Sequence, residues 1–335
     1  MGKFSENLRE LVSEGIDAQG LLVVFKKELA DHFSSYRFII LFALIAMVSL
    51  ISTYMTGVSL RDELEGIAKP KLVFLMLFTS GAWLSLDWFV AFLFPLIGIV
   101  LGFDSINREL SSGTMSKLVS QPIFRDSVIN GKFLAGITTI AIMLVSIVLV
   151  ISGLGLLLLG VVPGIEEVWR IIIYLVISII YVSFWLGIAM LSSIVFRSIA
   201  TSALASIAVW VFFFIFTLIG PPTLAKAFAP INQVGLDSET IVLNARIQEG
   251  VRLSSPMGLY SDATATVMNP MQKTTKSLVL MGPMERLSAS RFQSPLSLTQ
   301  SILVVWPYIV SLFALTLVCF GFSYGIFMRQ EIRSA

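Results

Sequence analysis

The charged side chains best placed to do chemistry lie in one stretch, from Asp104 to Lys132. This stretch separates two hydrophobic segments, each long enough to cross a bilayer. Its charges must lie in water, because charge inside hydrocarbon is expensive. They are Arg108, Glu109, Lys117, Arg125, Asp126 and Lys132. Side chains of this kind form ion pairs and hydrogen bonds, so the stretch is a candidate docking surface for another protein.

The pattern of the stretch predicts helix, break, short helix, break and helix. Gly113 interrupts after Glu109, and residues 114–121 then place Thr114 and Leu118 on one side of a short helix. Pro122 closes the segment, since proline cannot continue a helix and restricts the residue before it. Two interpretations stay open here: a protruding helical hairpin that docks into a partner, and an ordinary loop that happens to be helical.

Residues for catalysis or metal binding are scarce. The chain has one histidine, His32, and one cysteine, Cys319, so neither a metal site nor an intrachain disulfide is expected. It has no G-x-x-x-x-G-K-[ST] motif and is not expected to hydrolyse ATP by itself. Acids are nearly missing from the hydrophobic segments, and Asp87 falls at a boundary, which argues against proton or sodium coupling.

The charged stretch resembles the signature loop of ABC-2 type transporter permeases. The resemblance rests on Arg108-Glu109, Ser112-Gly113-Thr114, Leu118-Val119-Ser120-Gln121-Pro122, Arg125 and Gly131-Lys132, in this order and at this spacing. It implies that the short helix is a coupling helix, which sits in a cleft of a separate ATP-binding subunit. The contact residues so implied are Glu109, Gly113, Thr114, Leu118, Gln121, Pro122 and Arg125.

The same resemblance implies the assembly around the chain. Two copies, or one copy and a paralogue, pair with two ATP-binding subunits. No cofactor is expected in this chain, and ATP and Mg belong to the partner subunit. Because the family mostly exports, export of a substrate is the expected direction. The alternative is a membrane scaffold or sensor whose residues 220–300 bind an extracytoplasmic partner, although a scaffold would not need these residues at fixed separations.

Composition places the chain in the membrane. It has 335 residues, of which 56% are hydrophobic and 13% charged, and its mean hydropathy is +0.89. A soluble domain has about 25% charged residues. The net charge of +2 and the lack of a basic run give no reason to expect a nucleic-acid partner.

Hydropathy predicts an all-α protein with six spans, near 38–56, 88–103, 133–162, 171–195, 200–219 and 302–328. Residues 72–86 are apolar too, and are either a re-entrant segment or the first part of a long second span. Two spans contain a proline and a small-residue face that favours close helix packing or gating. These residues are Pro95, Gly98 and Gly102 in the second span, and Pro307, Gly321 and Gly325 in the sixth.

Before the first span, one helical face is apolar and the other charged. Leu22, Phe25, Leu29, Phe33 and Tyr36 share the apolar face, opposite Lys26, Lys27 and Asp31. This pattern predicts a helix in the membrane interface, with its lysines towards anionic headgroups. It resembles the elbow helix of the ABC-2 family. A helix that packs on a soluble partner is the alternative.

Lysine and arginine predict the orientation. They gather in residues 1–37, in the charged stretch, at Arg197 and after Met328, whereas the short loops on the other side hold fewer, diluted by acids. Both termini and the charged stretch are therefore expected in the cytoplasm of a cell-membrane protein. The expected regions are an arm and elbow helix (1–37), five spans with the loop 104–132 (38–219), an extracytoplasmic insertion (220–300), and the last span with its tail (301–335).

The insertion is expected to be helical. Gly220-Pro221-Pro222 should close the fifth span. Ser238 can cap a helix through Glu249, with Gly250 at its C′ position. Ser255-Pro256 can start another helix, which ends at Asn269-Pro270. A gate, a substrate-handling surface, a partner-binding cap and a lid that only stabilises a dimer all remain open.

Overall fold

The computed structural model describes residues 19–64, 72–80, 85–111, 124–230, 238–277, 279–282 and 294–330. Within these ranges the chain consists of helices and connecting turns, without β-strands. Residues 19–34 form the first described helix. The others are α2 Tyr36–Glu63, α3 Val73–Thr79, α4 Leu86–Gly102, α5 Asn107–Ser111, α7 Arg125–Leu159, α8 Ile165–Val195, α9 Ile199–Phe228, α10 Ser238–Leu253, α11 Pro256–Met268 and α13 Leu298–Arg329.

Six helical segments are long and apolar enough to cross a membrane: α2, α4 together with α5 (Leu86–Ser111), α7, α8, α9 and α13. The all-α fold and the six predicted spans are therefore confirmed, and the chain is a multi-pass membrane protein. Several spanning helices are longer than predicted. For example, α7 begins at Arg125 rather than near Phe133. Hydropathy marks the part of a helix that hydrocarbon covers, whereas the helix can continue where its polar side chains reach water.

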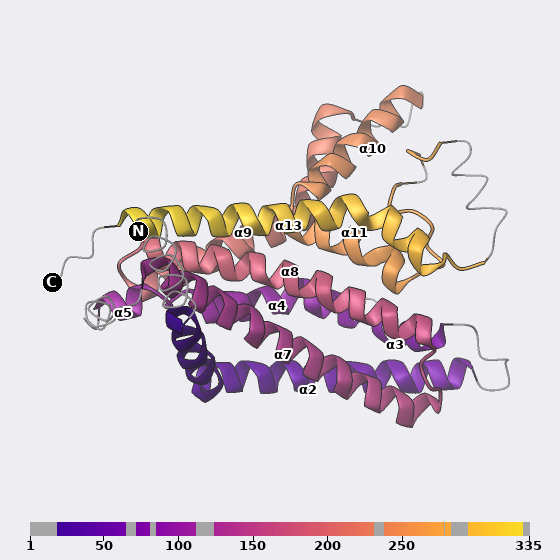
Figure 1. The fold of residues 1–335 in the computed structure, drawn as a ribbon. Coiled ribbons are helices and arrows are strands. Elements are labelled where there is room, and N and C mark those ends of the chain that lie inside the picture. The colour runs from indigo at the N-terminus through magenta and orange to yellow at the C-terminus, as the bar shows by residue number, and fades with distance from the viewer. Residues whose placement is uncertain are drawn as a thin grey trace, which may run out of the picture.

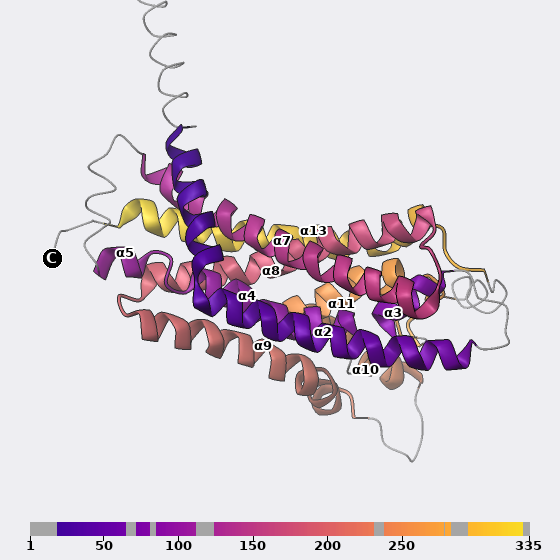
Figure 2. The same ribbon diagram turned by 90° about the horizontal axis from the view of Figure 1, so that it is seen from below.

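The long helices lie side by side, with α8 in the middle, packed against α4, α7 and α13 (Figure 1). The first helix, residues 19–34, turns steeply away from α2 and lies at the same end as α5 and the end of α13. We call this end of the bundle the terminal end, and the end that carries α3 the opposite end. Figure 2 shows α9 at the edge of the bundle, where few of its side chains are buried.

The segment 72–86 does not begin the second span. α3 is a separate short helix at the opposite end, and Phe74 and Phe78 in it are fully buried. A new helix, α4, then begins at Leu86, where the Ser85 hydroxyl accepts a hydrogen bond from the Trp88 amide at 3.3 Å. Glu167 holds α3 against α8, because its carboxylate accepts a hydrogen bond from the Phe74 amide at 3.0 Å.

The prediction that the fifth span ends at Gly220-Pro221-Pro222 is wrong. α9 continues through both prolines to Phe228. The last two turns of α9 pack against α10, and Pro221 is buried there. The Asn244 side chain of α10 donates a hydrogen bond to the Ala229 carbonyl at 2.8 Å. Tertiary packing thus holds these turns in a helical conformation that the local sequence disfavours.

The next two helices follow the sequence signals unequally. The prediction of a helix end at Gly250 is wrong, since α10 continues to Leu253. Its last turn is held by Arg252, whose side chain pairs with Asp262 of α11. The prediction for α11 is confirmed: Ser255 caps it by accepting from the Gly258 amide at 2.9 Å, Pro256 is its first residue, and Asn269 follows its end.

Candidate functional site

Four charged side chains meet at the terminal end of the bundle. Lys132 of α7 donates to Glu28 of the first helix at 2.7 Å and to Glu109 of α5 at 3.0 Å. Lys27 contacts the same two carboxylates, each at 3.0 Å. Lys132, Glu28 and Glu109 are buried. We call these four residues the charged cluster. Removing one partner from a buried ion pair is strongly destabilising, so the cluster holds three segments in a fixed arrangement.

Close packing of the first helix on α7 creates the cluster. A Cβ at Gly131 would lie 2.9 Å from Cγ1 of Val24 and 3.2 Å from the Leu21 carbonyl oxygen. Only glycine allows the two helices to approach this closely. The next residue, Lys132, is covered by the first helix, where Glu28 meets its ammonium group. On the predicted apolar face of the first helix, Leu22 and Phe33 are exposed, whereas Phe25 and Leu29 are partly buried.

Mutual charge stabilisation outweighs burial in the cluster. Burial by itself would raise the pKa of Glu28. The positive charges of Lys132 and Lys27 lower this pKa by more than burial raises it, so the pKa of the carboxyl lies below its usual value. Burial would also lower the pKa of Lys27, but Glu28 and Glu109 hold it above its usual value. Burial lowers the pKa of the neighbouring His32, which therefore stays neutral at pH 7. The four members of the cluster carry two charges of each sign.

The residues just before the loop 112–123 are also tied to the bundle. The Ser193 hydroxyl near the end of α8 accepts hydrogen bonds from the Ile106 amide at 3.0 Å and the Asn107 amide at 3.1 Å. Asp104 pairs with Arg37 at 3.2 Å and with Arg108 at 3.7 Å. α5 and the residues before it are therefore bonded to the first helix, α2, α7 and α8.

Arg125, at the start of α7, joins three helices. Its guanidinium donates to the Gln330 carbonyl at 2.7 Å and lies 5.7 Å from the centre of the Phe327 ring. The Gln330 side chain in turn donates to the Ile194 carbonyl of α8 at 2.9 Å. A cation at the last carbonyls of α13 is favourable, because the helix dipole is negative there.

A cavity of about 760 Å³ lies between the first helix and the α4–α5 segment. Its wall includes Lys27, Arg37, Asp104, Glu109 and Lys132. In the described part of the chain, no three His, Cys, Asp or Glu side chains are grouped as a metal site would require. The cavity thus lies directly beside the charged cluster and shares Lys27, Glu109 and Lys132 with it.

The structure brings together part of the predicted site. Glu109 and Arg125 lie at the two borders of the loop and contact other parts of this chain. The remaining predicted contact residues, Gly113, Thr114, Leu118, Gln121 and Pro122, fall outside the described residues. Glu28, Asn107 and Ser193 were not predicted to take part. The Gly131-Lys132 pair was the one sequence signal for close packing and charge at this point.

The predicted packing residues fall into two groups. A Cβ at Gly98 would lie 2.7 Å from the Val182 carbonyl oxygen, and one at Gly102 would lie 2.8 Å from that of Leu186. These two glycines, with the buried Pro95, lie where α4 packs against α8. By contrast, a Cβ at Gly321 or Gly325 would meet no atom of the described chain within 4 Å. Pro307 lies inside α13 and is exposed.

Comparison with known proteins identifies the family of this chain. The family model described as "ABC-2 family transporter protein" matches residues 22–332, which is nearly the whole chain. The matched region runs from the first helix to just beyond α13 and contains the charged cluster. No curated relative matches the sequence.

Proposed function

Because this chain belongs to the ABC-2 transporter family, we propose that it is the permease subunit of an ABC exporter. A separate ATP-binding subunit holds ATP and Mg and hydrolyses the nucleotide. Two permease chains, either identical or paralogous, form the membrane part of the complex. The terminal end of the bundle, which carries the first helix and the end of α13, faces the cytoplasm of a cell membrane, in agreement with the distribution of lysine and arginine.

The charged cluster is the observation that carries this proposal. Glu109 precedes the loop 112–123 by three residues and is held by Lys27 and Lys132. In the proposed mechanism, ATP binding closes the two ATP-binding subunits and displaces the loop, including the short helix that the sequence predicts at residues 114–121. The displaced loop pulls α5, and the buried ion pairs carry this movement to the first helix and α7. The hydrogen bonds from Ser193 carry it to α8.

The proposed class of cargo follows from the apolar side chains that the spanning helices expose. α2 and α9 expose apolar side chains along much of their length, among them Met47, Tyr54, Phe212 and Ile219. A lipid-like or amphipathic substrate that enters from the side suits such surfaces. Transport in inverted vesicles in one direction only, towards the cytoplasmic face, would contradict export.

The test is copurification with the ATP-binding subunit encoded nearest this gene, followed by ATPase assays with and without the permease. We expect a stable complex whose ATPase activity depends on the loop. Gly113→Pro should uncouple ATP hydrolysis from transport without preventing membrane insertion, because proline fixes φ at position 113 and restricts the residue before it, which changes the direction of the chain at the predicted break. Asp126→Asn is the matched control, since this acid lies in the first turn of α7, outside the charged cluster. Failure to form a complex under every nucleotide condition would contradict the proposal.

A further inference from the structure

α11 lies inside the bundle, although it belongs to the region that was expected outside the membrane. Tyr260 of α11 is fully buried, and its hydroxyl lies 3.0 Å from that of Ser178 in α8. Its ring stacks on Tyr181 with 4.4 Å between the ring centres. Ser178 is 13 residues from the start of α8. At 1.5 Å per residue, the contact with Tyr260 therefore lies about 20 Å along α8 from its first residue. α11 is thus a re-entrant helix that fills the opposite end of the bundle.

Polar side chains line the contact between α11 and the spanning helices. The Thr264 hydroxyl of α11 donates to the Asp87 carboxylate of α4 at 3.1 Å. In the same helix, the Thr266 hydroxyl donates to the Ser301 carbonyl of α13 at 3.1 Å. Among the described residues, Asp87 has no basic partner within ion-pair distance. Polar groups inside a membrane domain are rare and mark functional positions, and water can replace hydrogen bonds of this kind when helices separate.

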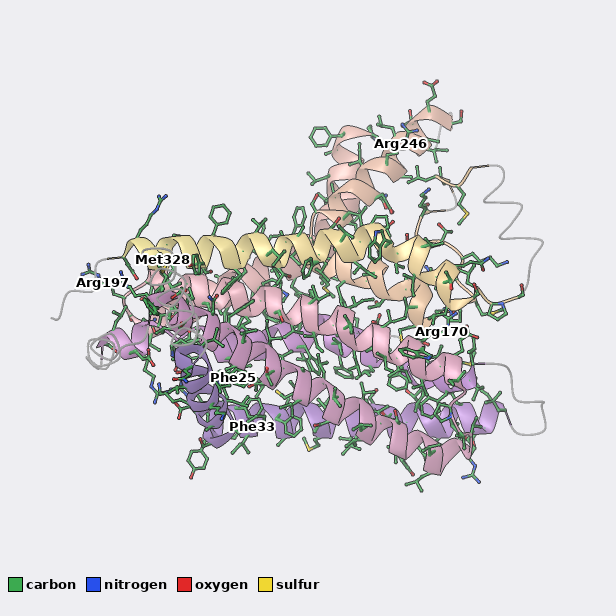
Figure 3. The ribbon with its side chains drawn as sticks, in the orientation of Figure 1. Phe25, Phe33, Arg170, Arg197, Arg246 and Met328 are labelled. Atoms are coloured by element: carbon green, nitrogen blue, oxygen red, sulfur yellow. The ribbon has the colours of Figure 1, made fainter. Side chains whose placement is uncertain are left out.

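Arg170 anchors the far end of α11. This side chain of α8 is fully buried at the opposite end of the bundle (Figure 3). Its guanidinium donates to the carbonyls of Thr266 at 3.3 Å and Val267 at 3.0 Å, and to the Ser301 hydroxyl at 3.1 Å. It also donates to the Leu296 carbonyl at 2.6 Å and pairs with Glu166 at 2.8 Å. A cation is favourable at the last carbonyls of α11 because of the helix dipole.

α10 is joined to α11 by an ion pair and by a short connection in the chain. Arg252 of α10 holds both carboxylate oxygens of Asp262 in α11, at 2.5 and 2.6 Å. Only Ser254 and Ser255 separate the two helices along the chain. α10 projects from the bundle beside the end of α9 (Figure 1). A shift of α10 is therefore passed directly to α11.

We infer that α11 is a movable closure of the opposite end of the bundle, and that Arg170 is the positioning residue that holds it closed. Withdrawal of α11 opens a path lined by Asp87, Tyr174 and Ser178, which are polar groups of α4 and α8. Water and the polar part of a cargo can enter this path. The inference rests on the proposed function for its driving force, since ATP use by the partner subunit supplies the movement.

Cysteine labelling tests the closure in the full-length chain, reconstituted in lipid nanodiscs with and without the ATP-binding subunit. Cys319→Ser removes the only native cysteine. Ala263→Cys then reports on α11, because Ala263 is fully buried, whereas Leu243→Cys on α10 is the exposed control. A water-soluble maleimide should label position 263 slowly and position 243 rapidly. Trapping the complex with a non-hydrolysable ATP analogue should accelerate labelling at position 263 alone.

Arg170 variants test the anchor. Arg170→Gln should speed labelling at position 263 by about 10- to 100-fold, as expected when hydrogen bonds to a charged donor are lost. Arg170→Lys should produce a smaller increase, because it keeps the charge and loses the planar fork. A disulfide between cysteines at positions 266 and 301 should abolish the increase. If Arg170→Gln does not assemble, Thr264→Val provides a milder opening of the same contact.

Two results would overturn the inference: slow labelling at position 263 in both Arg170→Gln and the nucleotide-trapped complex, or equally rapid labelling of positions 263 and 243 in the wild-type background. Complex formation and ATPase stimulation are measured separately and test the proposed function. The Arg170→Gln comparison in the permease alone tests the anchor even where no ATP-binding subunit associates.

Discussion

Replacing Lys132 by methionine removes the most deeply buried charge of the cluster. Methionine is an unbranched apolar side chain of similar length, so the packing is largely kept. Lys132 has 4% of its surface exposed and bonds to Glu28 at 2.7 Å and to Glu109 at 3.0 Å. Loss of one partner from a buried pair costs about 3–5 kcal/mol, because the remaining charge stays desolvated. Lys27 still contacts both carboxylates, so we expect about 3 kcal/mol, the lower end of this range.

The measurement is the free energy of unfolding in detergent, for Lys132→Met and for the triple variant Lys132→Met, Glu28→Gln, Glu109→Gln. The triple variant should recover most of the loss, because no unpaired buried carboxylate remains. Acid adds a second readout. The pKa of Glu28 is lowered in the folded protein, so its stabilisation is present above about pH 4.5, the usual value, and is lost as pH falls through the folded-state pKa.

Lys132→Met should therefore begin to unfold at a higher pH than the wild type. A loss below about 1 kcal/mol, the size of an exposed ion pair, together with an unchanged acid transition, would refute this account of the cluster.

Two further pairs of substitutions, each a test and its control, examine contacts between the helices. Gly98→Ala should destabilise the protein by about 1–3 kcal/mol, because its Cβ meets backbone atoms of α8 at 2.7 and 2.9 Å. Gly321→Ala, where the added atom meets nothing within 4 Å, should be neutral in thermal unfolding, and equal effects would contradict this reasoning. Arg125→Gln should lower stability by about 1 kcal/mol through loss of its bond to the end of α13. The control Arg329→Gln alters an exposed cation of α13, and an equal loss in both variants would remove the proposed role of Arg125.

Features that depend on neighbouring residues could be predicted from the sequence. α11 has the predicted cap at Ser255, proline at its first position and an end before Asn269. The six spans likewise follow from local hydropathy, because burying ~30 Å of helix in hydrocarbon requires about 20 apolar residues. These signals lie within a few residues of the structure that they determine, so no knowledge of the fold is needed.

Features that depend on distant contacts could not be predicted. The continuation of α9 past Pro221 requires α10, whose Asn244 bonds to the carbonyl of Ala229. The position of α11 inside the bundle depends on Arg170, whose acceptors at residues 267 and 296 are about a hundred residues away in sequence. Single residues such as these show no periodicity that would reveal their partners.

Only part of the candidate site was predicted, because the rest of it also depends on distant contacts. Glu109 and Arg125 were identified from the loop pattern, and contact with the ATP-binding subunit remains a prediction for both. The bond between Glu28 and Lys132 joins positions 104 residues apart, so the sequence did not indicate it. The predicted position of residues 22–36 in the membrane interface stays a prediction, and Lys27, expected to face headgroups, instead pairs with Glu28 and Glu109 of this chain.

ATP turnover in the assembled complex tests most directly whether the charged cluster transmits movement from the loop. The comparison is between wild type and Glu109→Gln, in complexes with equal amounts of permease and ATP-binding subunit. Glutamine keeps the shape of the side chain but removes the charge that holds Lys27 and Lys132. We predict that Glu109→Gln keeps the complex intact but loses the dependence of ATP hydrolysis on the permease. An intact Glu109→Gln complex with wild-type turnover and transport would contradict the account.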